Sequence, residues 1–152
     1  MQWGEIDLES KVWTVPAENM KAKIAHRVPL SPRMIEILNG QISLRLQDKL
    51  VFPSPRGKVF SDNTLSKFLR DHKASSDTKD RTAVVHGFRS SFRVWGAENG
   101  YPENLLEQSL AHTERNAVVA AYKRTDLLDE RRPIMKAWAN LVCGVETVPN
   151  AN

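Results

Sequence analysis

The sequence predicts an α+β fold that is mainly helical, with a small three-stranded antiparallel sheet at the N-terminus packed on a helical domain. Two observations support this prediction. Apolar and polar residues alternate in three short runs before residue 31, which is typical of strands. After residue 31 the apolar residues recur every three or four positions, which is typical of helices. The 152 residues are enough for one domain with a single hydrophobic core.

The predicted sheet is short in every strand. Glu9 and Ser10 form a polar turn between the first two strands, which predicts a hairpin. Pro29 cannot donate a ladder hydrogen bond, so it belongs at a sheet edge or at the end of the third strand. A sheet of this size needs helices on one face to be stable. The predicted strands span residues 3–8, 11–15 and 25–30.

Six helices are predicted from start signals followed by apolar residues at helical spacing. Ser31 and Pro32 combine a capping hydroxyl with the residue best tolerated at the first helical position. Asn39-Gly40 either ends this first helix or only weakens it, and the sequence leaves both open. The later helices are expected to start near residues 61, 86, 102, 117 and, for the last, 129 or 133, with loops at 50–57 and 73–82.

The composition permits an anionic partner without requiring one. Lys and Arg number 22 against 18 acidic residues, so the net charge is +4 and the pI about 9.4. No apolar run approaches the ~20 residues of a membrane-spanning helix, and no signal-peptide pattern opens the chain. The single cysteine, Cys143, excludes an internal disulfide, fits a reducing cytoplasm and is expected to be a packing residue.

Four residues of the central stretch can hold and cleave a phosphodiester. His86 and Arg89 share one face if their segment is helical, His112 closes an apolar helical run, and Tyr122 lies in the next helical stretch. A tyrosine phenol can displace a sugar hydroxyl and conserve the bond energy in a covalent phosphotyrosine. Arginine donates paired hydrogen bonds to phosphate oxygens, and histidine can orient or deprotonate the phenol.

These residue types, in this order, predict a DNA strand-cleavage site. The departing sugar oxygen needs a proton, which a lysine on a hairpin turn can deliver. Lys21 is the candidate general acid, with Lys23 as its alternative. Each residue alone is more often structural, whereas the combination favours chemistry. The candidate nucleophile, phosphate clamp, acid–base or orienting group and further phosphate donor are Tyr122, Arg89, His86 and His112.

The same motifs resemble the catalytic domain of the tyrosine recombinases, specifically the phage and prophage integrases. Residues 85–92, Val-His-Gly-Phe-Arg-Ser-Ser-Phe, look like the His-x-x-Arg box of that family. Residues 107–112 and 119–124 look like its closing His and Tyr segments. Residues 20–31 are similar to the β-hairpin that holds the family's catalytic lysine, and residues 131–139 match the helix after the tyrosine.

The resemblance implies site-specific recombination through a 3′-phosphotyrosine and a free 5′-hydroxyl, with no metal and no other cofactor. It implies double-stranded DNA attachment sites as the partner and a homotetramer on DNA for the full-length protein. It further implies a cytoplasmic, nucleoid-associated protein of a bacterium, with no membrane association. The basic residues beside these motifs are the candidate DNA contacts: Lys23, Arg27, Arg115, Lys123 and Arg124.

The resemblance also predicts which parts of the family are present. The family's first catalytic arginine lies upstream of the strand that begins at Trp3, as do the N-terminal DNA-binding domains. Residues 1–143 are therefore expected to form a partial integrase catalytic domain, and residues 144–152 a flexible tail. Loss of one preorganised phosphate donor typically costs on the order of 10²–10³ in rate, so the fragment alone is expected to be poorly active or inactive.

Three other functions compete with recombination. A non-catalytic DNA-binding remnant or regulatory module would use the same basic surface without covalent chemistry. A metal-dependent nuclease would use the histidines as ligands, but the four His and one Cys lack zinc-type spacing and no acidic pair accompanies them. A topoisomerase that uses tyrosine shares the chemistry, but its flanking sequences match less well. The sequence also leaves open whether the last helix packs in its own domain or on a neighbouring protomer.

Overall fold

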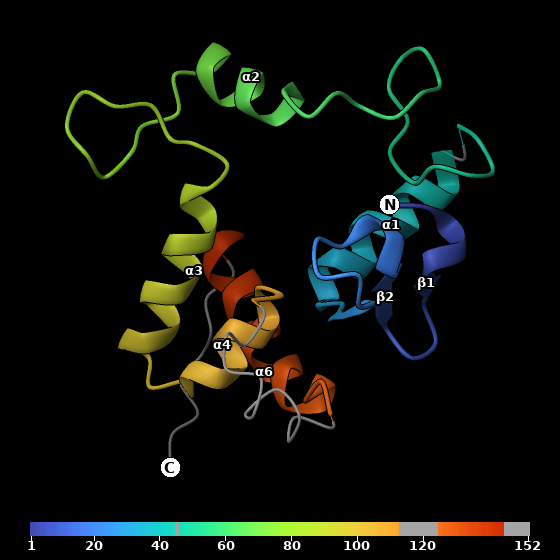
Figure 1. The fold of residues 1–152 in the computed structure, drawn as a ribbon. Helices are drawn as coiled ribbons and strands as arrows, with labels where there is room; N and C mark the ends of the chain where they lie inside the picture. The colour runs from blue at the N-terminus through green and yellow to red at the C-terminus, as the bar shows by residue number, and fades with distance from the viewer. Residues whose placement is uncertain (45, 113–124, 145–152) are drawn as a thin grey trace.

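A computed structural model describes residues 1–44, 46–112 and 125–144. Within these residues a three-stranded sheet precedes a set of helices, which confirms the α+β, mainly helical prediction (Figure 1). Two short 3-10 helices, η1 and η2, flank the first two strands. In chain order the elements are η1 Trp3–Glu5, β1 Ile6–Asp7, β2 Val12–Val15, η2 Ala17–Asn19, β3 His26–Pro29, α1 Pro32–Leu44, α2 Thr64–Asp71, α3 Gly87–Glu98, α4 Glu103–Ser109 and α6 Leu128–Val142.

The sheet is antiparallel in the order β1-β2-β3. Val12 pairs with Pro29 and Val15 with His26, so Pro29 ends its strand as the sequence predicts. The first strand differs, because residues 3–5 form η1 instead of extended chain. The Glu5 carboxylate accepts the backbone N–H of Gln2 at 3.0 Å, and this contact closes the turn before β1 can begin.

The first part of the core lies between the sheet and α1. Leu30, Leu38 and Val51 are buried at its centre. Ser31 Oγ accepts the backbone N–H of Met34 at 3.3 Å, so the predicted capping hydroxyl does start α1. The helix then continues through Asn39-Gly40 to Leu44, which settles the alternative that the sequence left open. Partly buried side chains around this core are Met1, Trp3, Ile6, Leu8, Trp13, Met34 and Ile35.

The second part of the core joins α3, α4 and α6. Its buried centre is formed by Phe92, Leu105, Leu106 and Ile134. Trp138 of α6 meets Phe92 of α3 edge-on, with ring centroids 5.5 Å apart. Gly96 lets α3 approach α4 closely, because a Cβ there would lie 2.4 Å from a methyl carbon of Leu106.

Helix α6 connects the two halves of the molecule. It packs against β3 and also contacts α1. Arg132 donates hydrogen bonds to the backbone carbonyls of Ser10 (3.0 Å) and Lys11 (3.3 Å), in the turn between β1 and β2. The helix begins at Leu128, so of the two predicted starts the one at 129 is confirmed within one residue. Cys143, which directly follows this helix, is exposed, so the prediction that it is a packing residue is wrong.

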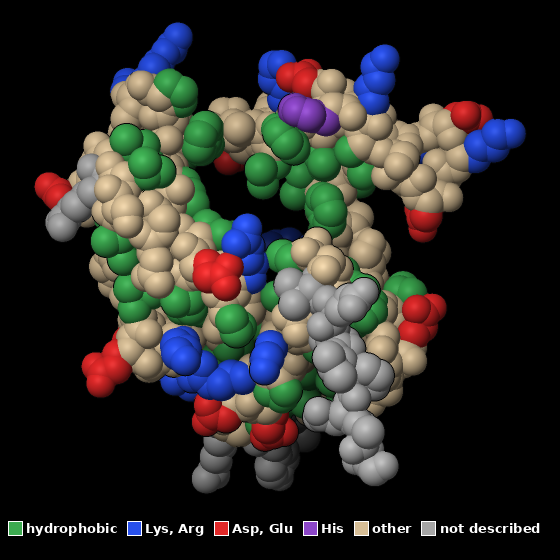
Figure 2. Space-filling model, turned by 180° about the vertical axis from the view of Figure 1, so that it is seen from behind, with side chains coloured by type: hydrophobic (Ala, Val, Ile, Leu, Met, Phe, Trp, Pro, Cys, Tyr) green, Lys and Arg blue, Asp and Glu red, His purple; other side chains and the backbone are tan. Residues whose placement is uncertain are grey.

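Helix α2 stands apart from both parts of the core. Figure 1 shows it on an arch of loops that spans from the end of α1 to the start of α3. Figure 2 shows hydrophobic side chains bordering the open space that this arch encloses. Leu65 and Phe68, predicted on one side of the helix, are both more than half exposed, at 63% and 56%. Among the described residues, no helix has the length and apolar character needed to cross a membrane.

Candidate active site

The His-x-x-Arg motif occupies the start of α3. His86 is the residue before the helix, and the backbone N–H of Arg89 donates to its carbonyl at 3.1 Å. The Arg89 side chain is half-buried, and its Nη2 donates to the carbonyl oxygen of Leu110 at 2.7 Å. This bond uses one of the five N–H donors of the guanidinium group. Arg89 is thus held against the end of α4, whereas the His86 side chain is exposed.

Helix α4 ends in a Schellman turn that leads directly to His112. Ala111 has a left-handed backbone with φ of 53°. Its N–H donates to the carbonyl of Gln108 at 3.1 Å, and the N–H of His112 donates to the carbonyl of Glu107 at 3.0 Å. These two bonds satisfy carbonyl groups that the helix end would otherwise leave unpaired. His112 therefore lies two residues from the carbonyl that Arg89 binds.

A carboxylate holds the His112 ring. His112 Nδ1 is in hydrogen-bond contact with Oε2 of Glu107. The other oxygen of Glu107 lies 3.1 Å from Nε of Arg93, and Arg93 also binds Glu103 at 2.6 Å. The imidazole, the carboxylate and the guanidinium of Arg93 thus form one chain of polar contacts between α3 and the end of α4.

The start of β3 reaches the same end of α4. His26 is half-buried and lies beside a backbone group of Ser109. Burial lowers the pKa of His26, and the positive charge of Arg131 lowers it further, while Asp126 and the Ser109 backbone act in the opposite direction. His26 of β3 and Arg89 of α3 therefore lie against adjacent residues at the end of α4, Ser109 and Leu110.

Ion pairing ties β3 to the segment that precedes α6. Arg27 donates from Nε and Nη2 to the two carboxylate oxygens of Asp126, at 2.7 and 2.6 Å. Arg131 is fully buried; its Nη2 donates to the carbonyl of Arg27 at 2.8 Å and lies 3.6 Å from Asp126. The hydrogen bonds from Arg27 hold the pKa of Asp126 below its usual range.

The predicted lysines lie in the turn between η2 and β3. Lys21, the candidate general acid, is exposed in this turn. Lys23 has a left-handed backbone with φ of 56°, and its Nζ donates to the carbonyl of Glu18 at 3.3 Å. This turn leads into β3, whose first residue, His26, lies beside Ser109 at the end of α4. Four other predicted site residues lie outside the described residues: Arg115, Tyr122, Lys123 and Arg124.

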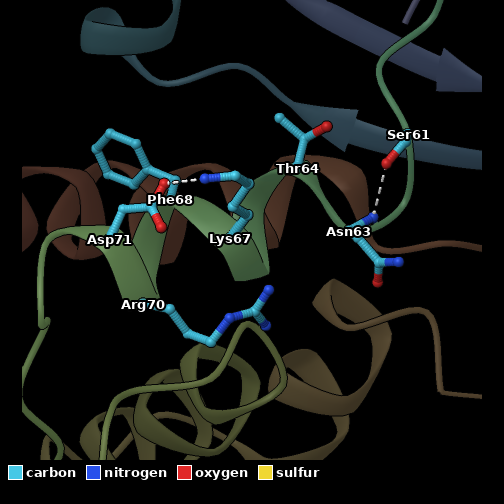
Figure 3. A pocket seen from close by; sticks show the side chains of 7 residues that line it. All are labelled: Ser61, Asn63, Thr64, Lys67, Phe68, Arg70 and Asp71. Carbon is cyan, nitrogen blue, oxygen red and sulfur yellow. Dashed lines mark hydrogen bonds and ion pairs between the residues drawn. The ribbon is translucent and has the colours of Figure 1, made fainter.

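A pocket of about 320 Å³ lies elsewhere, on α2. Figure 3 shows Lys67 turned toward Asp71, with which it forms an ion pair, and Ser61 bonded to the backbone of Asn63. None of the predicted catalytic residues that the structure describes lines this pocket. Of the predicted catalytic residues, Arg89 and His112 are the ones that the described residues bring to the end of α4.

A family model described as the phage integrase family matches residues 1–127. The chain belongs to the phage integrase family. The match spans every motif of that resemblance except the helix after the tyrosine, which begins beyond it. No solved structure matches the chain significantly.

Curated integrases align with nearly the whole chain. The prophage integrase IntA of Escherichia coli K12 is 34% identical over 143 residues, which cover 93% of this chain and 33% of that protein. The integrase of Enterobacteria phage P4 is 36% identical over 155 residues, covering 91% of this chain and 35% of its own length. The integrase of Shigella phage Sf6 is 29% identical over 143 residues, which cover 92% of this chain and 36% of that protein. The chain therefore spans about a third of the length of the curated relatives that it matches.

Sequence reasoning assigned no role to three residues that surround the predicted site. Glu107 was recognised only as the start of the closing His segment, although it lies within reach of His112 across a helix end. His26 and Asp126 carry no local signal, because their partners lie far away in the sequence. An integrase sequence shows which catalytic residue types are present, but its motifs do not reveal the groups that hold them.

Proposed function

We propose that this chain forms the C-terminal part of the catalytic domain of a site-specific DNA recombinase, which integrates and excises phage, prophage or genomic-island DNA. The observation that supports the proposal best is the bond from Arg89 to the end of α4, two residues before His112. Arg89, the candidate phosphate clamp, and His112, the candidate second donor, thus lie near the same helix end, and the chain belongs to the phage integrase family. The proposed domain covers residues 1–143, followed by a tail at 144–152.

The proposed reaction uses the phenol of Tyr122 as nucleophile. Its oxygen attacks the phosphorus of one DNA strand while the bond from phosphorus to the 5′ oxygen of the next nucleotide breaks. Lys21 donates the proton that turns this oxygen into a free 5′-hydroxyl. The product is a 3′-phosphotyrosine, and attack by a 5′-hydroxyl on it rejoins the strand and releases the phenol. The step needs no metal and no external energy source.

The remaining groups act on the phosphate and the phenol. Arg89 donates to the non-bridging oxygens, which gain charge in the transition state. His112 supplies a further donor, and His86 orients or deprotonates the phenol. These roles fit the residue types and their order along the chain. Arg89 suits a clamp because its side chain is already oriented by the Leu110 carbonyl before a phosphate arrives.

The proposed partner is double-stranded DNA at attachment sites, bound by a homotetramer of the full-length protein in the bacterial cytoplasm, at the nucleoid. Basic residues near the site would contact the DNA backbone. Among them, Arg27 would have to exchange part of its bidentate contact with Asp126 for a phosphate. The other proposed DNA contacts are Lys23, Arg115, Lys123 and Arg124.

A suicide-substrate experiment tests the proposal. The 152-residue chain is incubated with nicked duplex DNA whose sequence around the nick is randomised, so that cleavage releases a short strand and traps the covalent adduct. We expect adducts that resist SDS, persist in EDTA and disappear in Tyr122→Phe. The rate is expected to be low, because the resemblance assigns one phosphate-binding arginine to a segment upstream of Trp3. An adduct that survives Tyr122→Phe, or one that EDTA abolishes, would contradict the proposal.

The same experiment addresses the alternative of a non-catalytic DNA-binding module. Such a module would retain DNA in a salt-dependent manner, because phosphate contacts release counterions. Retention that is equal in wild type and Tyr122→Phe, together with no adduct from any DNA in the pool, would favour this alternative over recombination.

A further inference from the structure

The turn at the end of α4 brings His112 back over Glu107. The left-handed Ala111 reverses the chain, so the N–H of His112 bonds to the backbone carbonyl of Glu107. The two side chains then meet as well, with His112 Nδ1 against Glu107 Oε2. Both a backbone bond and a side-chain bond therefore join the same pair of residues.

Glu107 is held in place from its other side. Its Oε1 lies 3.1 Å from Nε of Arg93, one helical turn after Arg89 on α3. Its side chain is 26% exposed, against 40% for His112, so the carboxylate is the more enclosed partner of the pair. Among the described residues Oε1 has this ion pair but no hydrogen-bond partner, so the carboxylate lies between the charge of Arg93 on one side and the His112 ring on the other.

The bond also selects which ring nitrogen of His112 faces a ligand. An ionised carboxylate only accepts hydrogen bonds, so Nδ1 must carry a proton in this contact. Nε2, on the far side of the ring, is then the atom left for another partner. We infer that Glu107 is a positioning residue for His112: it accepts from Nδ1–H and thereby favours the doubly protonated ring, whose Nε2–H then donates to the phosphate of the DNA. This inference rests on the recombinase function proposed above.

Glu103 offers a matched control because it shares Arg93 with Glu107. Arg93 Nη2 lies 2.6 Å from Glu103 Oε1, so a Gln at either position removes one negative charge beside the same guanidinium. The described contact to His112 belongs to Glu107. Glu107→Gln and Glu103→Gln therefore differ in whether the ring loses its carboxylate partner.

The first measurement is the tautomer of His112, read by nitrogen-15 NMR of the histidine-labelled chain at high pH, where the imidazole is neutral. His112→Gln assigns the signals. In wild type and Glu103→Gln we expect the proton on Nδ1. In Glu107→Gln we expect the proton to move substantially to Nε2, because the new amide can donate to Nδ1. A proton on Nε2 in wild type, or the same tautomer in all variants, would overturn the inference.

The second measurement is the rate of adduct formation on the suicide-substrate pool. Glu107→Gln should lower it by roughly 10- to 100-fold, because an amide that donates to Nδ1 disfavours the doubly protonated ring that binds the phosphate, while Glu103→Gln should not. A tautomer that shifts while the adduct rate of Glu107→Gln equals that of wild type would overturn the positioning role. No adduct from any variant, combined with the expected tautomer shift, would count against the recombinase proposal while the orientation of His112 by Glu107 stands.

Discussion

Arg27 and Asp126 lie 99 residues apart in the sequence and are joined by two hydrogen bonds of 2.7 and 2.6 Å. Arg27 belongs to β3, which follows the turn with the candidate general acid Lys21. Asp126 lies four residues after the candidate nucleophile Tyr122. Through this pair the lysine turn and the chain that follows the tyrosine share one anchor.

Asp126→Asn should weaken this anchor without unfolding the protein. Arg27 is half exposed, so solvent screens that pair and its share of the loss in free energy of unfolding should be at most about 1 kcal/mol; a larger loss would come from the fully buried Arg131, which lies 3.6 Å from the same carboxylate. Urea denaturation of wild type and Asp126→Asn measures it, with Asp129→Asn, which removes an exposed pair with Arg132, as control. A loss of several kcal/mol would show that Asp126 supports more of the fold than this contact.

The same pair predicts a response to acid. Hydrogen bonds from Arg27 lower the pKa of Asp126 in the folded chain, so between its unfolded and folded pKa values the unfolded chain binds more protons. The stabilisation by Asp126 is therefore present above about pH 4 and is lost as the pH falls through the folded pKa. The free energy of unfolding of Asp126→Asn should fall less steeply than that of wild type below about pH 4. Parallel curves would contradict this assignment.

His26 should make the protein less stable at mildly acidic pH. Burial, followed by the charge of Arg131, lowers its pKa in the folded chain, so the neutral ring is favoured there. The unfolded chain takes up a proton first, and stability falls as the pH drops below about 6.5 toward the folded pKa. Urea titrations between about pH 8 and 5 should show a smaller decline in His26→Gln than in wild type.

The control for that titration is His72→Gln. His72 is an exposed residue at the end of α2, away from Arg131 and Asp126. Its replacement should leave the pH dependence of wild type unchanged. If His72→Gln flattens the curve as much as His26→Gln does, the decline does not come from the buried ring beside α4.

Gly96→Ala should separate α3 from α4. The added Cβ would lie 2.4 and 2.8 Å from the two methyl carbons of Leu106, which is 1% exposed and has no room to move. Overpacking of this kind typically costs about 1–3 kcal/mol in free energy of unfolding. Gly40→Ala is the matched control, since its Cβ would meet nothing within 4 Å, and in α1 it should stabilise by up to about 1 kcal/mol. Equal effects of the two substitutions would refute the close approach.

Ala111→Gly should stabilise the chain slightly. Ala111 has φ of 53°, a conformation that costs an L-residue roughly 1–2 kcal/mol and glycine almost nothing. The added freedom of glycine in the unfolded chain offsets part of this gain, so a net increase of about 0.5–1 kcal/mol is expected. Thermal unfolding measures the change, and Ala97→Gly, within α3, should have the opposite sign. Destabilisation by Ala111→Gly would show that the left-handed turn is not what ends α4.

Much of the fold follows from local signals in the sequence. The Ser31 cap of α1 and the polar turn at Glu9 and Ser10 each depend on contacts within three residues, which the sequence displays directly. The prediction that the first strand starts at Trp3 was wrong, because residues 3–5 form a 3-10 helix. Glu5 has the right alternation for a strand, but its carboxylate can reach back three residues to Gln2, and the alternation pattern does not show that competing bond.

The sequence by itself determined the order of the motifs, the family that they resemble and the residue types available for phosphate chemistry. Only the tertiary structure decided that Arg89 rests on the Leu110 carbonyl, that Glu107 holds His112, and that Asp126 ties β3 to the chain before α6. Arg89 and Asp126 reach partners on segments far away in the sequence, and the Glu107 contact requires a left-handed reversal at Ala111. Local periodicity records neither kind of contact, because both depend on how the chain turns and packs after its helices have formed.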